Sequence, residues 1–381
     1  MIDYEYIDNE PDLRKMQKQL RRPGRLSIDL ESDSYHHYGE KIALIQLSDG
    51  KHIFLLDPFE VDISVLAPLF QDGSREKIFH DVDYDGRMIF TFLKVKPYPI
   101  FDTMIAGRML GREKVGLADL LNECFDLNLD KGLQKADWSQ RPLSREMLKY
   151  AALDVAYLLP LRDHLAGEIE ATGRTKWATE EFARLVNNLE AMPEREVNVL
   201  KFKGARELNS RQLAILEKLL HWRERKAKSF DVPNFKIIGN ERLLRIAEYQ
   251  PRSRRALEES RILSPRQLAR FGNDIAVAVE RGLKVPAPKL PNFPRQVHQK
   301  RDLVAERVLR NLKTVRDRKA GELKLDPGFL MPNGILKAIA KAKPQDISEM
   351  RECCGLRNWQ LDVMGEALIQ SIHRATGRHV T

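Results

Sequence analysis

Hydrophobic positions in the first 165 residues alternate between short apolar runs and segments with helical spacing. The apolar runs are bounded by Gly, Pro or Asp, which is typical of buried strands. They predict strands at 26–32, 43–50, 52–58 and 77–81. The helical spacing predicts helices at 12–22, 62–70, 87–95, 101–110, 117–125 and 143–165. Three early strands followed by a helix and another strand favour an α/β domain, with a mixed sheet flanked by helices.

The rest of the chain contains an internal repeat. WRERKA at Trp222–Ala227 matches VRDRKA at Val315–Ala320, and the same offset pairs Gln267 with Gln360. Such agreement predicts a duplicated all-α module. In the first copy, a long amphipathic helix is followed by short helical segments near 243–247, 254–259 and 265–282. Between the copies, four prolines within residues 284–296 exclude a helix and predict a stiff spacer.

Charge divides the chain in the same place as the patterns do. Residues 1–200 carry 26 Lys+Arg and 35 Asp+Glu, whereas the remaining residues carry 38 and 20. A basic surface of this size favours a polyphosphate partner, because binding releases condensed counterions. Nucleic acid is therefore the expected partner, and an acidic protein is the alternative. At 381 residues and 43% hydrophobic content, the chain is long enough for two or three domains with real cores.

Cysteine use and hydropathy predict a cytoplasmic protein without a membrane partner. Cys124, Cys353 and Cys354 have no zinc-site spacing, and an odd number gives no disulfide framework. The first residues, MIDYEYIDNEPDLRK, are polar and acidic rather than an apolar signal core. No stretch approaches the roughly 20 apolar residues of a membrane span.

Four carboxylates and a tyrosine are the strongest chemical signal. Asp29 and Glu31 are two apart on a predicted strand, so the pleat turns both to one side. Tyr150 and Asp154 are four apart on a predicted helix and share one face. Asp85 falls at the start of the helix that follows the strand at 77–81. A fold that gathers these oxygens needs cations to neutralise them, which predicts a divalent-metal site.

Each of these signals has an ordinary alternative when taken alone. An Asp-x-Glu strand or a Tyr-x-x-x-Asp helix is more often solvated surface, and Asp85 could be one of several helix N-cap acids. Their order along the chain favours the functional interpretation. The series DxE, HxxxxD from His80 to Asp85, and YxxxD resembles the exonuclease motifs of the DEDD superfamily, in its tyrosine-bearing branch.

Flanking phrases narrow the resemblance to bacterial ribonuclease D. These phrases are YIDNEPDL, GEKIALIQLSDG, FDTMIAGRML, LDKGLQKADWSQRPLS and YAALDVAYLLPL, and they span about residues 4–165. The duplicated module is similar to the HRDC domain of helicases and ribonuclease D. The resemblance implies a ribonuclease H-like exonuclease domain at 1–170, a helical connector at 171–204, HRDC-like domains at 205–284 and 300–377, and a Pro-rich linker at 285–299.

The resemblance also implies a mechanism. Two Mg²⁺ or Mn²⁺ ions would activate water and stabilise the leaving 3′ oxygen. Asp29 would bridge both ions, Glu31 and Asp154 would hold the ion that carries the water, and Asp85 would support the other. Tyr150 would orient the attacking water. The implied enzyme is a monomeric 3′-to-5′ exoribonuclease that releases 5′-mononucleotides and trims tRNA precursors and other structured RNAs.

Further residues are weaker candidates for contact with RNA. His80 could touch the terminal nucleotide, Trp138 could stack on a base and Arg141 could meet phosphate, although plain structural roles are the alternative. In the first module, the basic candidates are Arg223, Arg225, Lys226, Lys228, Arg252, Arg254 and Arg255. Two competing functions stay open. One is a DNA 3′-to-5′ exonuclease with the same five residues, and the other is a non-catalytic RNA-binding protein.

Overall fold

The protein is described by a computed structural model that covers residues 2–21, 24–130, 132–193, 196–294 and 301–377. The chain forms two compact units. Unit 1 comprises residues 1–31, 42–192 and 299–381, and unit 2 comprises residues 32–41 and 193–298. No helix within the described ranges is both long and apolar enough to cross a membrane. The domain boundaries predicted from the sequence stay a proposal.

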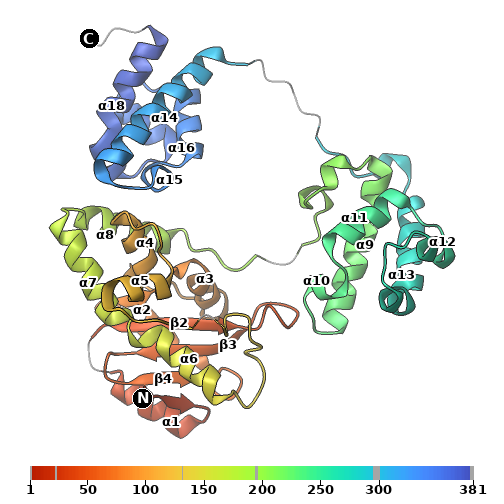
Figure 1. The fold of residues 1–381 in the computed structure, drawn as a ribbon, viewed down its shortest axis with the longest axis horizontal. Coiled ribbons are helices and arrows are strands. Elements are labelled where there is room, and N and C mark those ends of the chain that lie inside the picture. Colours follow the sequence, from red (N-terminus) through yellow and green to blue (C-terminus); the bar gives the residue numbers. More distant parts are fainter. Residues whose placement is uncertain (1, 22–23, 131, 194–195, 295–300, 378–381) are drawn as a thin grey trace. The chain divides into compact units, whose positions relative to one another are not determined.

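Unit 1 contains a six-stranded mixed sheet with the order β1-β4-β3-β2-β5-β6 (Figure 1). The strands are β1 (Glu5–Ile7), β2 (Leu26–Ser32), β3 (Ile42–Ser48), β4 (Ile53–Leu56), β5 (Lys77–Phe79) and β6 (Ile100–Asp102). β3 and β4 are antiparallel, whereas β1 pairs with β4 and β5 pairs with both β2 and β6 in parallel. This confirms the predicted mixed sheet, to which the structure adds the short strands β1 and β6.

Helices cover both faces of this sheet. They are α1 (Glu10–Gln19), α2 (Ala67–Gln71), α3 (Val82–Leu93), α4 (Thr103–Met109), α5 (Leu117–Phe125), α6 (Arg145–Ala156), α7 (Leu158–Ala171) and α8 (Thr175–Asn187), with a 3₁₀ turn η1 (Ile63–Leu66) before α2. On one face, α6 covers β3 and β4 (Figure 1). There, Leu44 of β3 and Leu55 of β4 belong to one core cluster with Met147 and Ala151 of α6. The larger core, which includes residues of α3, α4 and α7, is built on the same strands. The prediction of one helix over 143–165 is wrong, because α6 ends at Ala156 and α7 begins at Leu158. Pro160 in the first turn of α7 cannot donate to Ala156 O, which explains the break.

The first helical module lies in unit 2. Its helices are α9 (Ser210–Ser229), α10 (Asn234–Ile237), α11 (Asn240–Tyr249), α12 (Arg254–Glu259) and α13 (Pro265–Leu283), with 3₁₀ turns η2 (Val199–Lys201), η3 (Ala205–Glu207) and η4 (Ala287–Lys289). α9 and α13 pack together, and close approach requires glycine at Gly282, where a Cβ would lie 2.5 Å from Ile215 Cα. The helix N-terminus at Ser264 has the capping box with Gln267 that its sequence favours.

The second module repeats this architecture. It consists of α14 (Leu303–Leu323), α15 (Pro327–Leu330), α16 (Asn333–Ala342), α17 (Ile347–Cys354) and α18 (Asn358–Thr376). The repeat extends to individual hydrogen bonds. Arg223 donates to Ile238 O and Asn240 Oδ1, and its counterpart Arg316 donates to the equivalent atoms of Met331 and Asn333. Two copies of one fold therefore follow the sheet, as the sequence repeat predicts.

Within unit 1, the second module packs against α8. The rings of Trp177 on α8 and Trp359 on α18 stack with centroids 4.7 Å apart. Trp359 Nε1 donates to Glu181 Oε1 at 2.9 Å, and Arg357 forms an ion pair with the same carboxylate at 2.8 Å. The equivalent positions in the first module hold Ser264 and Arg266, so only the second copy carries these docking groups.

Candidate active site

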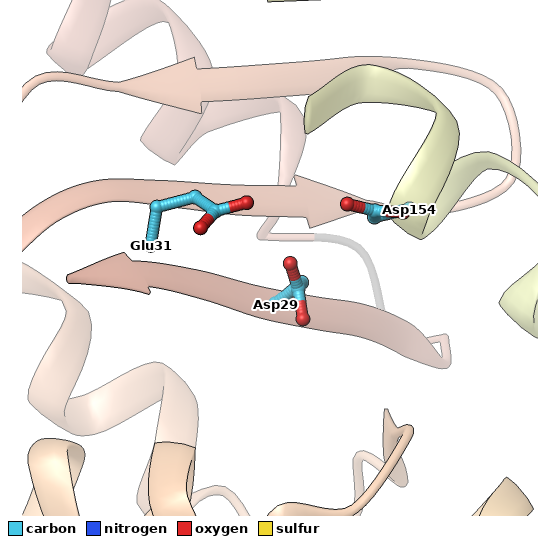
Figure 2. Close-up of side chains that lie close together, drawn as sticks. All are labelled: Asp29, Glu31 and Asp154. Atoms are coloured by element: carbon cyan, nitrogen blue, oxygen red, sulfur yellow. The ribbon is translucent and has the colours of Figure 1, made fainter. Parts of the chain in front are cut away.

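Strand β2 and helix α6 bring three carboxylates together. Asp29 and Glu31 extend from β2 and Asp154 extends toward them from α6 (Figure 2). An oxygen from each of the three lies within 4.8 Å of the others. The two-residue spacing on the strand and the position of the helix over the sheet produce this convergence. The predicted pairing of the two motifs is therefore present in the fold.

Asp85 contributes a fourth negative charge from α3. It is 7% exposed and lies in the first turn of α3, where the sequence predicts it. Its charge raises the pKa of Glu31, which places it in electrostatic range of the group formed by Asp29, Glu31 and Asp154. It is not one of the three residues whose oxygens lie within 4.8 Å of one another.

Burial makes these carboxylates unusually basic. It raises the pKa of Asp29 to about 7 and, together with the charge of Asp29, that of Asp154 to about 8. Burial and the neighbouring acids also raise the pKa of Glu31 and Asp85 well above their usual range. Among the described residues, no lysine, arginine or histidine forms an ion pair with any of the four. Grouped acids without a protein cation have the oxygen chemistry that hard divalent cations require.

A cavity of about 320 Å³ opens over this group. Besides Asp29, Glu31, Asp154 and Tyr150, its lining includes His80 and residues between α5 and α6 such as Asp130 and Gln134. Asp130 and Gln134 were not predicted as site residues, because an isolated polar residue in a loop carries no periodic signal. Two larger cavities of unit 1, about 920 and 600 Å³, are lined by none of the five predicted site residues.

Tyr150 stands beside the acids as a neutral phenol. Burial, followed by the charges of Asp154 and Glu31, raises the pKa of its hydroxyl. Its ring packs against Trp138, with centroids 6.0 Å apart. Trp138 itself is 1% exposed and belongs to the core under α6. The structure thus contradicts the prediction that Trp138 stacks on a base, because its ring is enclosed by protein and supports Tyr150.

Arg141 also has a structural role in place of the predicted phosphate contact. Its guanidinium forms an ion pair with Asp57 and donates to the carbonyl oxygens of Trp138 and Ala43, each at 2.8 Å. Its guanidinium carbon lies 4.7 Å from the centroid of the Phe59 ring. The donors are therefore used to hold the loop before α6 against β3 and β4.

His80 lines the cavity with a defined tautomer. Thr103 Oγ1 donates to Phe79 O at 3.1 Å, so it accepts from His80 Nδ1 at 2.9 Å. Burial lowers the pKa of His80 to about 4, which keeps the ring neutral. A neutral ring with its proton on Nδ1 has a hydrogen-bond acceptor at Nε2.

Asp102 joins the two helices that flank this region. Its carboxylate accepts from Val82 N at 2.8 Å and from Ile105 N at 2.9 Å, at the starts of α3 and α4. The residue before α3, Asp81, has a left-handed backbone with φ of 66°. Asp102 therefore fixes the turn from which α3 positions Asp85.

The basic candidates of unit 2 fall into two groups. Arg223 is 7% exposed and its guanidinium bonds within the module, so the prediction that it contacts phosphate is wrong. Lys226 is partly buried and forms an ion pair with Asp274 at 2.8 Å. The other candidates lie on the surface of the module: Arg225, Lys228, Arg252, Arg254 and Arg255.

Comparison with known proteins identifies similar sequences and folds along most of the chain. The profile of the 3′-5′ exonuclease family matches residues 4–170, and that of the HRDC domain matches residues 212–279 and 305–372. Ribonuclease D of Bartonella henselae is 30% identical over 381 positions, covering 98% of this chain and 91% of the relative. Ribonuclease D of a Shewanella species is 32% identical over 274 positions, 71% of each chain. The crystal structure of Escherichia coli RNase D, an exoribonuclease involved in structured RNA processing, is similar with a TM-score of 0.73 and 26% identity, over 98% of this chain and 99% of that chain.

Proposed function

The chain belongs to the ribonuclease D family of 3′-to-5′ exoribonucleases, and from this premise we propose that it trims the 3′ ends of tRNA precursors and other structured RNAs. The products would be 5′-mononucleotides. One chain supplies all five site residues, so a monomer suffices for the activity. The predicted cytoplasmic location is part of the same proposal.

The enclosed group of acids is the observation that carries the proposal. Asp29, Glu31 and Asp154 offer converging oxygens, and Asp85 adds charge beside them. We assign to these four residues two divalent ions, Mg²⁺ or Mn²⁺, because such ions prefer carboxylate oxygen ligands. When bound, the ions supply positive charge that polarises the scissile phosphodiester and stabilises its leaving oxygen.

Tyr150 positions the water that attacks the phosphorus. The raised pKa keeps its phenol protonated at working pH, so the hydroxyl orients water by hydrogen bonding and does not abstract a proton. Trp138 packs against the Tyr150 ring on the side of the core and limits its movement. The hydroxyl and the acids therefore line the same cavity.

The size of the cavity favours attack at a chain end. Its volume of about 320 Å³ is at the lower limit of small-ligand sites, which measure roughly 300–1,000 Å³. Such a space admits a terminal nucleotide and excludes a base-paired duplex. Digestion of a frayed 3′ trailer would then stop at a paired acceptor stem.

His80 would read a hydroxyl of the terminal ribose. Its Nε2 is an acceptor in the tautomer that Thr103 fixes, so it pairs with a hydroxyl group better than with a phosphate oxygen. The 2′-hydroxyl is the group that distinguishes RNA from DNA. This role favours the exoribonuclease over the competing DNA exonuclease.

The exposed bases of unit 2 would hold the body of the RNA. Arg225, Lys228, Arg252, Arg254 and Arg255 all lie on the surface of the first module. Arg255 forms an ion pair with the exposed Glu259, one helical turn away, and such a surface pair is weak. These side chains can replace their contacts with water and nearby carboxylates by contacts with RNA phosphates. Such contacts release counterions, so RNA binding should weaken as the salt concentration rises.

Digestion of a tRNA precursor with a 3′ trailer and a 5′ label tests this function. We expect products that shorten from the 3′ end and accumulate near the acceptor stem, with no shortening in EDTA. A matched DNA strand should be degraded more slowly. Internal cleavage, shortening from the 5′ end, or RNA binding without hydrolysis would contradict the proposal.

A further inference from the structure

The segment that follows the acids of strand β2 belongs to unit 2 and is held there by hydrogen bonds. Residues 32–41 continue directly from Glu31 and pack with the first module. His37 Nδ1 lies 2.7 Å from Asp231 Oδ2, and Tyr38 N donates to the other oxygen of this carboxylate at 3.2 Å. The Tyr38 hydroxyl donates to Glu224 on α9. These contacts hold the segment in a defined position on α9 and the turn after it.

An exposed aromatic pair results from this anchoring. Tyr35 is 48% exposed and Phe235 of α10 is 52% exposed, with ring centroids 5.5 Å apart. Lys236 Nζ lies 5.8 Å from the centroid of the Tyr35 ring. We name Tyr35, Phe235 and Lys236 the Tyr35 platform. It combines two half-exposed aromatic rings with a cation, and aromatic rings and positive charge are the two components of single-strand binding sites.

The second module lacks the platform at the equivalent positions. There, Phe235 and Lys236 are replaced by Gly328 and Phe329. Phe329 packs beside Trp359, with centroids 6.3 Å apart, in the contact with α8. The second copy therefore uses this part of the module for docking inside unit 1. In unit 2, by contrast, Phe235 of the first copy and the adjacent Tyr35 stay about half exposed. Large exposed aromatic side chains that neighbour one another mark an interaction site.

The covalent chain keeps the platform near the acids. Tyr35 is four residues after Glu31, so their Cα atoms cannot be more than about 14 Å apart at any arrangement of the two units. A strand whose 3′ end lies among the carboxylates can therefore reach the platform with its next few nucleotides.

We propose that the Tyr35 platform binds single-stranded RNA upstream of the two 3′-terminal nucleotides. Tyr35 and Phe235 stack on bases, and Lys236 meets a phosphate. Stacking requires only a flat ring, so the site accepts any base sequence. The proposal rests on the proposed function, because it takes the strand direction from the 3′-terminal site.

Binding in EDTA tests the platform without hydrolysis. The probes are 5′-fluorescein-labelled oligouridylates of ten nucleotides, with anisotropy as the readout. The double variant Tyr35→Ala/Phe235→Ala should bind about tenfold or more weakly than the wild type. Tyr35→Phe should bind as tightly as the wild type, because it keeps the ring. Tyr249→Ala is the matched control, since Tyr249 is a 55% exposed aromatic residue of the same unit, and it should leave affinity unchanged.

A short substrate separates the platform from the active site. The kcat/KM of the double variant for a dinucleotide with Mn²⁺ should equal that of the wild type, because two nucleotides do not reach the platform. Undiminished affinity of the double variant for the ten-nucleotide RNA would overturn the proposal and is the result expected of a protein-docking patch. An equal loss on the dinucleotide would overturn it too. Failure of the wild type to hydrolyse any RNA would instead overturn the proposed function.

Discussion

At the residue scale, Trp138 and Tyr150 illustrate what the sequence can reveal about a site. Tyr150 was predictable because its helical spacing from Asp154 places both on one face. Trp138 was predicted to stack on an RNA base. It lies in a loop, where no periodic pattern of apolar residues indicates whether a side chain is buried, and only the fold shows that its ring packs against Tyr150. The predicted phosphate contacts of Arg141 and Arg223 were wrong for a similar reason. Arg141 donates to Ala43 O, which is distant in the sequence, and Arg223 donates to Ile238 O, which a turn brings back to it.

Tyr150→Phe should separate water positioning from metal binding. Removing the hydroxyl leaves Asp29, Glu31, Asp85 and Asp154 in place, so Mn²⁺ affinity measured by calorimetry should change less than about threefold. The single-turnover rate should fall by about 10². Asp29→Asn is the comparison, because it removes an oxygen from the centre of the group and should weaken Mn²⁺ binding strongly. A Tyr150→Phe enzyme with the wild-type rate would exclude the positioning role.

His80→Ala should narrow the preference for RNA over DNA. The Nε2 acceptor is lost, so kcat/KM for RNA should fall by about tenfold while that for the matched DNA changes little. Because burial lowers the pKa of His80 to about 4, this preference should stay constant between pH 6 and 8. A preference that varies across this range, or an equal loss on both substrates, would remove His80 from this role.

At the scale of elements, periodic segments were predicted well and short or interrupted ones were not. β2, β3 and β4 are apolar runs bounded by turn residues, and they form where the pattern places them. β1 and β6 have three residues each, too few for a period, and they exist because β4 and β5 offer hydrogen-bonding partners. The break at Tyr157 between α6 and α7 lies three residues before Pro160, which has no N–H to donate to Ala156 O and whose ring clashes with that carbonyl. The apolar spacing continues past this point, so the prediction of one helix followed the spacing and missed the proline.

The contact of the second module with α8 should depend on Trp359. This indole is 2% exposed, stacks on Trp177 and donates to Glu181. Trp359→Ala should lower the free energy of unfolding in urea by about 3–5 kcal/mol. Arg266→Ala, at the equivalent and exposed position of the first module, is the control and should change it by less than about 0.5 kcal/mol. Equal changes in the free energy of unfolding at the two positions would contradict a specific role of Trp359 in the contact with α8.

At the scale of the whole molecule, the acid group links metal binding to stability. Folding raises the pKa of Asp29 to about 7 and that of Asp154 to about 8, from ordinary values near 3.8. Well below pH 3.8 both states are protonated and the group has no effect on stability. As pH rises toward 8, the unfolded chain releases these protons more readily than the folded chain, so the metal-free protein loses stability.

Thermal unfolding in EDTA should therefore show a midpoint that falls by several degrees between pH 5.5 and 8. Mg²⁺ or Mn²⁺ should raise the midpoint, and more at pH 8 than at pH 5.5, because the ions bind the deprotonated acids. Asp154→Asn is the control, since it removes one titrating group and should flatten the dependence. A midpoint in EDTA that rises over this interval to the same extent in both proteins would contradict the assignment.

The most direct test of the central claim compares the wild type with Asp29→Asn on one RNA. The substrate is a 5′-labelled hairpin with a single-stranded 3′ tail, incubated with Mn²⁺ and analysed for both the shortened strand and the released nucleotide. The four-acid site predicts that the wild type removes the tail as 5′-mononucleotides up to the stem. Asp29→Asn should be folded and able to bind the RNA, but it should release less than about 10⁻³ of the nucleotide that the wild type releases in the same time. Hydrolysis by Asp29→Asn at a rate close to that of the wild type would contradict the account.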